Sequence, residues 1–154
     1  MPHHAENRRL PYTAQQIFDL VADVERYPEF LPWTSVARVR SRAPLEGRSA
    51  GAELMEADLV ISFKVFRERF GSRVVLLPEE GRIETEFMDG PFKYLHSVWE
   101  VRDLRKGGCK VSFEVDFELR NAMLRRVIGV VFDEAMRRVV RAFERRADAL
   151  YGGK

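Results

Sequence analysis

The C-terminal region is predicted to form one long amphipathic helix, and this feature restricts more than any other what the chain can fold into. Asn121 is a suitable N-terminal cap, and Gly152-Gly153 is a suitable stop. The apolar positions between them are Leu124, Val127, Ile128, Val131, Phe132, Ala135, Met136, Val139, Phe143 and Leu150. They recur at helical spacing. Because such a helix is stabilised mainly by packing, the rest of the chain must provide an apolar face that covers it.

The middle of the chain provides that face as a series of strands. The clearest one covers residues 110–119, whose apolar phase is Val111, Phe113, Val115, Phe117 and Leu119, alternating with polar residues. Further strands are predicted over Val36 to Arg42, Ala52 to Phe63, Phe66 to Leu77, Arg82 to Phe87 and Tyr94 to Asp103. Turn residues separate several of them, for example Asp89-Gly90-Pro91 and Gly107-Gly108. Short connections favour an antiparallel meander.

The N-terminal part adds a strand and a helix. A short strand is predicted from His3 to Leu10, and Thr13 with Gln16 forms a capping box that starts a helix. Prolines restrict residues 27–33 to a turn-rich connector, whose aromatic groups indicate either a plug on the core or the rim of a ligand entrance. Residues 1–154 are therefore predicted as a single α+β domain, an antiparallel sheet covered by the final helix.

Composition narrows the functional classes. The formal net charge is +2, too small to indicate a nucleic-acid partner by itself, and we expect no DNA partner. The single cysteine, Cys109, excludes an internal disulfide. No stretch is apolar and long enough to span a bilayer, and we expect neither a secretory signal nor a transit peptide.

Motifs for catalysis are absent from the sequence, so we expect no enzyme, no catalytic residue and no metal site. His96 is interpreted as a surface histidine on a strand, Cys109 as an ordinary thiol, and His3-His4 as the polar start of a strand. The alternative is a small cyclase or hydrolase on the same fold. It would need a polar group inside the domain, such as His96 or Glu56 facing inward.

Several motifs together resemble one known family. Residues 20–33, LVADVERYPEFLPW, resemble the first helix and connector of the coenzyme Q-binding START-domain proteins, a family that also includes the bacterial ribosome-association toxins. Residues 89–95, DGPFKYL, followed by Trp99, are similar to its mid-chain signature. Residues 117–119 and 142–147 are similar to its final strand and helix. The resemblance implies a helix-grip (START, Bet v 1-like) fold, in which a curved antiparallel sheet wraps around the C-terminal helix.

The resemblance implies two functions. The first is non-enzymatic binding or delivery of ubiquinone, or a similar isoprenoid lipid, which would lie in a hydrophobic tunnel. This function would support respiratory electron transport. Ubiquinone would be a bound ligand and not a covalent cofactor, and the respiratory chain or a membrane surface would be a partner. The alternative is binding to the large ribosomal subunit, which blocks subunit joining in translation initiation. Trp33 and the preceding Leu-Pro favour the quinone branch. Without a transit peptide, we expect a bacterial protein of the cytoplasm or the periphery of the inner membrane.

The predicted ligand-lining residues come from the apolar phases. They are Phe30, Leu31 and Trp33 at the mouth, Ile61, Phe87, Leu95, Trp99, Phe113 and Phe117 on the sheet, and Val127, Val131 and Ala135 on the helix. Apolar burial supplies about 25 cal/mol per Å², so a long isoprenoid tail needs no strong polar anchor. A slip of one residue in strand phase would reverse each assignment on the sheet.

The final helix also carries many arginines. They are Arg125, Arg126, Arg137, Arg138, Arg141, Arg145 and Arg146, mixed with Asp133, Glu134, Glu144 and Asp148. The mixture of signs favours a solvated face. The alternative is a patch for anionic headgroups or RNA phosphate, on which the ribosome-binding alternative would depend.

Overall fold

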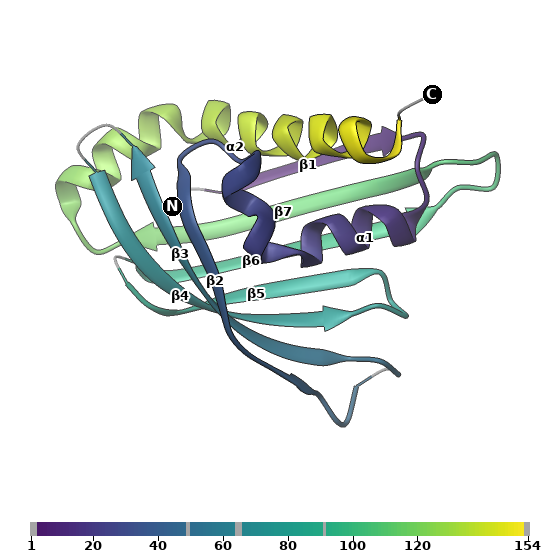
Figure 1. Ribbon diagram of the computed structural model, residues 1–154. Coiled ribbons are helices and arrows are strands. Elements are labelled where there is room, and N and C mark those ends of the chain that lie inside the picture. The colour runs from purple at the N-terminus through teal and green to yellow at the C-terminus, as the bar shows by residue number, and fades with distance from the viewer. Residues whose placement is uncertain (1–2, 49, 64–65, 91, 153–154) are drawn as a thin grey trace.

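In the computed structural model, which describes residues 3–48, 50–63, 66–90 and 92–152, seven strands form one antiparallel sheet in the order β1-β7-β6-β5-β4-β3-β2 (Figure 1). The strands are β1 (His3–Leu10), β2 (Thr34–Pro44), β3 (Glu53–Phe63), β4 (Phe66–Leu77), β5 (Arg82–Asp89), β6 (Phe92–Asp103) and β7 (Cys109–Leu119). The helices are α1 (Ala14–Ala22), the 3₁₀ helix η1 (Val24–Glu29) and α2 (Ala122–Tyr151). Within the described residues, no helix is long and apolar enough to cross a membrane.

The predicted helix starts are confirmed. The backbone N–H of Gln16 donates to Oγ1 of Thr13 at 3.0 Å, and the N–H of Thr13 donates to Oε1 of Gln16 at 3.0 Å. At the start of α2, the N–H of Met123 donates to Oδ1 of Asn121 at 2.8 Å. Each cap satisfies backbone donors that have no partner inside the helix, which explains why both helices begin where the sequence predicts.

The strand predictions are confirmed with small differences at the ends. β1 and β4 have the predicted limits, whereas β2 extends to Thr34 and Pro44, and β5 and β6 extend into the turn around Gly90. These extensions occur because ladder hydrogen bonds continue beyond the last residue that follows the apolar alternation. Figure 1 shows β1 and β7 running beneath α2, while β2, β3 and β4 cross them at a steep angle.

Irregular register bends the sheet. The pairing of β2 with β3 shifts between Val39 and Ser41, which leaves Arg40 as an extra residue, and the pairing of β4 with β5 shifts between Gly71 and Ser72. An extra residue on one strand bends it and increases its twist. The sheet therefore has a concave inner face toward α2 and a convex outer face.

The core covers much of the inner face, from Met55 and Ala57 of β3 to β6 and β7. Trp99, Val111 and Phe113 are buried there against α1 and the C-terminal half of α2. The helices contribute Ile17, Leu20 and Val21 from α1 and Phe132, Val140, Phe143 and Ala147 from α2. Because α1 and α2 both cover β6 and β7, most of the apolar inner residues of these strands are buried.

The inward phase of β1 is polar, which the sequence did not indicate. His4, Glu6 and Arg8 lie opposite the buried valines and phenylalanine of β7. His4 Nε2 lies 2.7 Å from Glu6 Oε1, and Arg8 Nε donates to Glu6 Oε2 at 2.7 Å. Arg8 Nη1 donates to Glu144 Oε1 of α2 at 3.2 Å. This ladder of paired charges connects the edge strand to the long helix, as buried charges require.

Glu6 is the centre of that ladder. Burial raises the pKa of its carboxyl, but the hydrogen bonds from His4 and Arg8 outweigh burial, so the pKa lies below its usual range. The carboxylate is thus ionised beneath α2. The predicted polar start of the strand is confirmed as a strand, but His4 faces inward and is buried.

Candidate functional site

The aromatic connector is packed onto the C-terminal half of α2. The Tyr27 and Phe30 rings meet the Phe143 ring edge to face, with centroids 5.4 and 5.2 Å apart. The Tyr27 hydroxyl donates to the Val21 carbonyl, and burial raises the pKa of this phenol. Such edge-to-face pairs add to the free energy of burial. The connector is therefore held on the core at Tyr27 and Phe30, as a plug would be.

Arg146 ties the same segment to α2. Its guanidinium carbon lies 5.2 Å from the centroid of the Phe30 ring, and Nη2 donates to Glu29 Oε1 at 2.7 Å. The hydrogen bond from Arg146 holds the pKa of the Glu29 carboxyl below its usual range. This arginine belongs to the connector contact and not to the outer face of the helix.

Trp33 ends the connector in an unusual backbone conformation. Its φ is +65°, the left-handed region that bulky residues rarely adopt, and its carbonyl accepts a hydrogen bond from the N–H of Ser62 at 2.7 Å. Such a conformation costs about 1–3 kcal/mol and persists only where the surroundings impose it. Trp33 is half-buried at the point where the connector becomes β2.

Other apolar side chains of the inner face stay partly exposed, several of them packed against the edge of the core. We call these residues the apolar inner surface: Ala37, Val39, Leu59, Ile61, Phe87 and Leu95 on the sheet, with Met136 and Val139 on α2. The apolar inner surface, bordered by the connector, is the candidate site for an apolar ligand.

The structure separates the predicted lining residues into two groups. All six on the sheet have the inward phase, as predicted. Trp99, Phe113 and Phe117 belong to the packed core, where Trp99 lies 4.5 Å from Phe113 and Phe117 lies 4.8 Å from Phe132 between ring centroids. The half-buried group consists of Phe30, Leu31, Trp33, Ile61, Phe87, Leu95 and Ala135. The side chains of Val127 and Val131 lie outside the described residues. Ligand contact stays a prediction for all of them.

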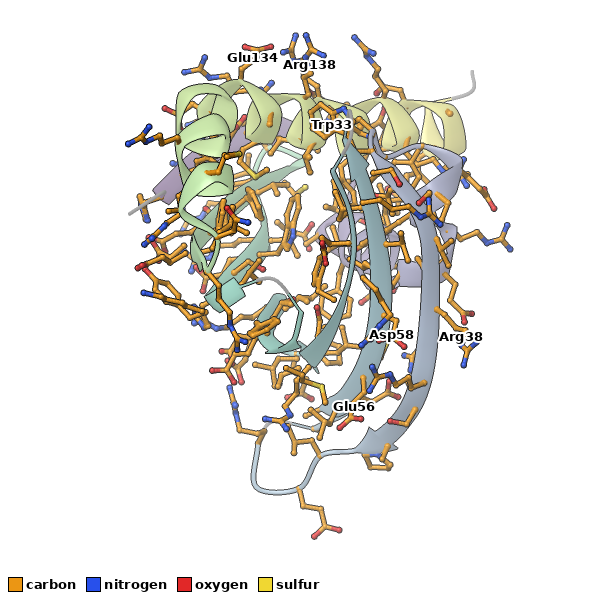
Figure 2. The ribbon with its side chains drawn as sticks, turned by 90° about the vertical axis from the view of Figure 1, so that its left-hand side faces the viewer. Trp33, Arg38, Glu56, Asp58, Glu134 and Arg138 are labelled. Carbon is orange, nitrogen blue, oxygen red and sulfur yellow. The ribbon has the colours of Figure 1, made fainter. Side chains whose placement is uncertain are left out.

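Neither polar group named for the enzyme alternative faces inward. His96 is exposed on the outer face of β6, and Glu56 lies on the outer face of β3, where Figure 2 shows it near Asp58. The inner face instead holds Ser72 of β4, which is 3% exposed. Its hydroxyl has no hydrogen-bond partner among the described residues. The sequence carried no signal for Ser72, since a lone serine in a strand usually faces water.

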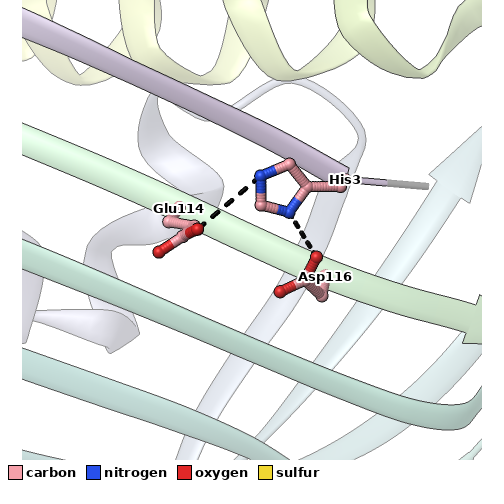
Figure 3. Close-up of side chains that lie close together, drawn as sticks. All are labelled: His3, Glu114 and Asp116. Atoms are coloured by element: carbon pink, nitrogen blue, oxygen red, sulfur yellow. Dashed lines mark hydrogen bonds and ion pairs between the residues drawn. The ribbon is translucent and has the colours of Figure 1, made fainter. Parts of the chain in front are cut away.

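Three groups on the outer face lie close enough to share a cation. His3, Glu114 and Asp116 each offer one atom within 4.8 Å of the others (Figure 3). His3 Nδ1 is hydrogen-bonded to Asp116, and Nε2 lies 3.6 Å from Glu114 Oε2. The hydrogen bond to the Asp116 carboxylate raises the pKa of the His3 imidazole. The hydrogen bond between His3 and Asp116 accounts for the closeness of these groups.

The outer face of α2 carries both signs of charge, as the sequence predicts. Arg138 and Arg141 both donate to Glu134 Oε2, at 3.3 and 3.4 Å, and Figure 2 shows the first of these pairs. Arg125 donates to Glu118 of β7 at 3.2 Å. Arg126, Arg137 and Arg145 are exposed. Acidic residues thus offset much of the positive charge along this helix.

The chain is similar to known proteins both in sequence and in structure. Residues 10–144 match the family described as polyketide cyclase / dehydrase and lipid transport. The ribosome association toxin RatA of Pseudomonas aeruginosa is 37% identical over 150 residues, 97% of this chain and 98% of that protein. The mitochondrial coenzyme Q-binding protein COQ10 homolog B of Xenopus laevis is 29% identical over 153 residues, 97% of this chain but 59% of that protein. A START superfamily protein from Mycobacterium smegmatis superposes with a TM-score of 0.75 at 20% identity, covering 96% of this chain and 98% of that one.

Proposed function

This chain belongs to the polyketide cyclase / dehydrase and lipid transport family, and from that premise we propose that it associates with the ribosome and acts by binding, not by catalysis. Its fold is the helix-grip fold that the resemblance implied: a curved antiparallel sheet with a long C-terminal helix, similar to a START superfamily protein. The observation that carries the proposal is the similarity to the Pseudomonas aeruginosa ribosome association toxin, which spans nearly all of both chains.

The similarities favour this function over the quinone binding that the resemblance placed first. The coenzyme Q-binding relative is less similar, and 59% of its length is matched. The outward position of His96 and Glu56 also supports binding, because neither of these residues could act on a ligand at the inner face. The large subunit is the partner we propose, as the resemblance implied.

Purified protein is expected to co-sediment with purified large ribosomal subunits and not with small subunits. Protein contacts with phosphates release condensed counterions, and this release is less favourable at higher salt concentration. Binding should therefore weaken steeply as salt increases from about 50 to 200 mM. Sedimentation with each subunit over a salt series measures this. A protein that stays in the supernatant with both subunits at the lowest salt would contradict the proposed function.

A second candidate function follows from the apolar inner surface. Partly exposed residues such as Leu59, Ile61 and Phe87 are unusual on the inward face of a sheet, and one relative is named for coenzyme Q binding. An isoprenoid chain placed against them would gain about 25 cal/mol for each Å² removed from water. Ubiquinone or a similar isoprenoid lipid is therefore the ligand class we propose for this surface.

Replacing Leu59 with glutamine is expected to reduce ubiquinone uptake at least several-fold, because the amide would lie on the apolar inner surface without a partner. The matched control is Val60→Gln, the neighbouring residue of β3 on the outer face. Uptake is measured by titration at low and high salt, together with mass spectrometry of lipid that co-purifies from the native host. Absence of any bound lipid and of any uptake by the unmodified protein would exclude this candidate.

A further inference from the structure

Three hydroxyl side chains lie next to one another on the inward face of the adjacent strands β4, β5 and β6 (Figure 1). We call them the hydroxyl row: Ser72 of β4, Thr85 of β5 and Ser97 of β6. Thr85 is directly opposite Ser97, and Ser72 is opposite Phe87, two residues from Thr85 on the same strand. Directly opposed side chains have Cβ atoms about 4.5–5.5 Å apart, and diagonal neighbours are about 7–8 Å apart. The three hydroxyls therefore form one row across the middle of the sheet.

Each member of the row also has a buried apolar residue directly opposite it on a neighbouring strand. These residues are Ala57 for Ser72, Val74 for Thr85 and Val115 for Ser97. Residues that are directly opposed in an antiparallel pair lie on the same face of the sheet. The hydroxyl row consequently shares the inward face with the core.

Ser72 is the most informative member of the row. Its side chain is 3% exposed, and its hydroxyl has no hydrogen-bond partner among the described residues. A buried hydroxyl without a partner costs free energy, which is why most such groups in folded proteins are paired. The apolar side chains around Ser72 cannot accept its proton. An oxygen atom of a bound molecule would satisfy it.

The row lies where the packed core meets the apolar inner surface. On β5, Thr85 is placed between Ile83, which is buried, and Phe87, which is partly exposed. On β6, Ser97 likewise lies between a residue of the buried core and Leu95, which is partly exposed. A ligand on the apolar inner surface would therefore meet the hydroxyls at its inner end.

The chemistry of the row selects among possible ligands. A pure hydrocarbon would leave the Ser72 hydroxyl without a partner. An ionised headgroup would need an opposite charge nearby, and the described residues directly opposite and beside the row on these strands are uncharged. A carbonyl oxygen accepts hydrogen bonds and carries no net charge. A quinone ring has two such oxygens on opposite sides, so each can accept from a different member of the row.

We propose that the hydroxyl row binds the carbonyl oxygens of a quinone headgroup, while the isoprenoid tail lies over Phe87 and Leu95. This inference rests on the isoprenoid-lipid binding proposed above as the second candidate function, and it specifies how the ligand is oriented. On apolar burial alone, a long tail needs no strong polar anchor. The row supplies an anchor that carries no charge.

The test compares two probes, ubiquinone and squalene, because squalene is an isoprenoid without a headgroup. Ser72→Ala/Thr85→Val removes two hydroxyls and nearly keeps the shape of both side chains. It should bind ubiquinone at least about tenfold more weakly, since two hydrogen bonds are lost, and squalene within about threefold of the unmodified protein. The control is Ser41→Ala, an exposed serine on the outer face of β2, which should leave both affinities unchanged. Equilibrium titration measures the affinities.

Two further measurements separate a ligand contact from a role in the fold. The infrared carbonyl stretch of bound ubiquinone should lie at lower wavenumber than in hexane, and the double variant should lose part of this shift. Thermal unfolding of the ligand-free protein should have the same or a higher midpoint in Ser72→Ala, because its hydroxyl has no partner to lose. A lower midpoint would assign the hydroxyl to the fold and overturn the inference.

The binding outcomes distinguish the inference from the function on which it rests. Unchanged ubiquinone affinity in the double variant overturns the inference, as would be found if water satisfied Ser72. Equal weakening for ubiquinone and squalene also overturns it, because the change would then act on packing. If the unmodified protein binds squalene but not ubiquinone, the apolar site stands and the inference fails. Binding of neither probe contradicts the second candidate function itself, and the inference falls with it.

Discussion

Replacing Phe143 with alanine is expected to lower the free energy of unfolding by about 3–5 kcal/mol. The side chain is 6% exposed and belongs to the core. Its ring meets Tyr27, Phe30 and Trp99, with centroid distances of 5.4, 5.2 and 4.9 Å. Three parts of the molecule, namely the connector, the sheet and α2, therefore meet at one residue. None of them can fill the cavity that the missing ring leaves without losing another contact.

Urea denaturation measures this effect, followed by the fluorescence of the two tryptophans, Trp33 and Trp99. The matched control on the same helix is Leu150→Ala, whose side chain is 51% exposed. It should change the free energy of unfolding by about 0.5 kcal/mol or less. A loss below about 1 kcal/mol for Phe143→Ala would show that the connector does not depend on this aromatic contact.

Replacing Gly90 with alanine is expected to cost about 2–4 kcal/mol, the second large effect. Gly90 lies between β5 and β6 with φ of +137°, a conformation open almost only to glycine. A Cβ there would lie 2.6 Å from Cβ of Phe70 and 3.0 Å from the carbonyl oxygen of Arg69. Because these atoms belong to the neighbouring strand β4, the turn must move away from the sheet.

Gly47→Ala separates the steric part of this effect from the backbone part. Gly47 also has a positive φ, +84°, but a Cβ there has no neighbour within 4 Å. This control should cost about 1–2 kcal/mol, the ordinary penalty of the left-handed conformation. Chemical denaturation of both variants gives the difference. Equal losses for Gly90→Ala and Gly47→Ala would mean that the close approach to β4 is relieved without cost.

Much of the fold could be predicted because its signals are local. Thr13 with Gln16 and Asn121 act on backbone groups within four residues, and the structure confirms both caps. The alternation in residues 110–119 also placed Phe113 and Phe117 correctly on the inner face. It did not show which inward residues would be enclosed. That depends on the tertiary packing: Met55 and Ala57 of β3 are buried, while Leu59 and Ile61 of the same strand stay partly exposed.

The polar residues of β1 show a further limit of sequence patterns. The apolar alternation of a strand predicts its inward phase, but β1 has no such alternation, since its residues are polar apart from Ala5 and Leu10. His4, Glu6 and Arg8 face inward because β1 pairs with β7 in the register that sets them opposite Val115, Phe113 and Val111. Partners on α2, such as Glu144, then compensate the burial of charge. Those partners come from the far end of the chain.

The sequence by itself determined the order of helices and strands, their caps and the apolar phase of most strands, because each depends on residues a few positions apart. Only the tertiary structure decided that Asp58 of β3 accepts hydrogen bonds from both Arg40 of β2 and Arg69 of β4. This contact depends on the register of β2 against β3 and on the register of β4 against β3. Hydrogen bonds between strands set both, and no periodicity along one segment encodes them.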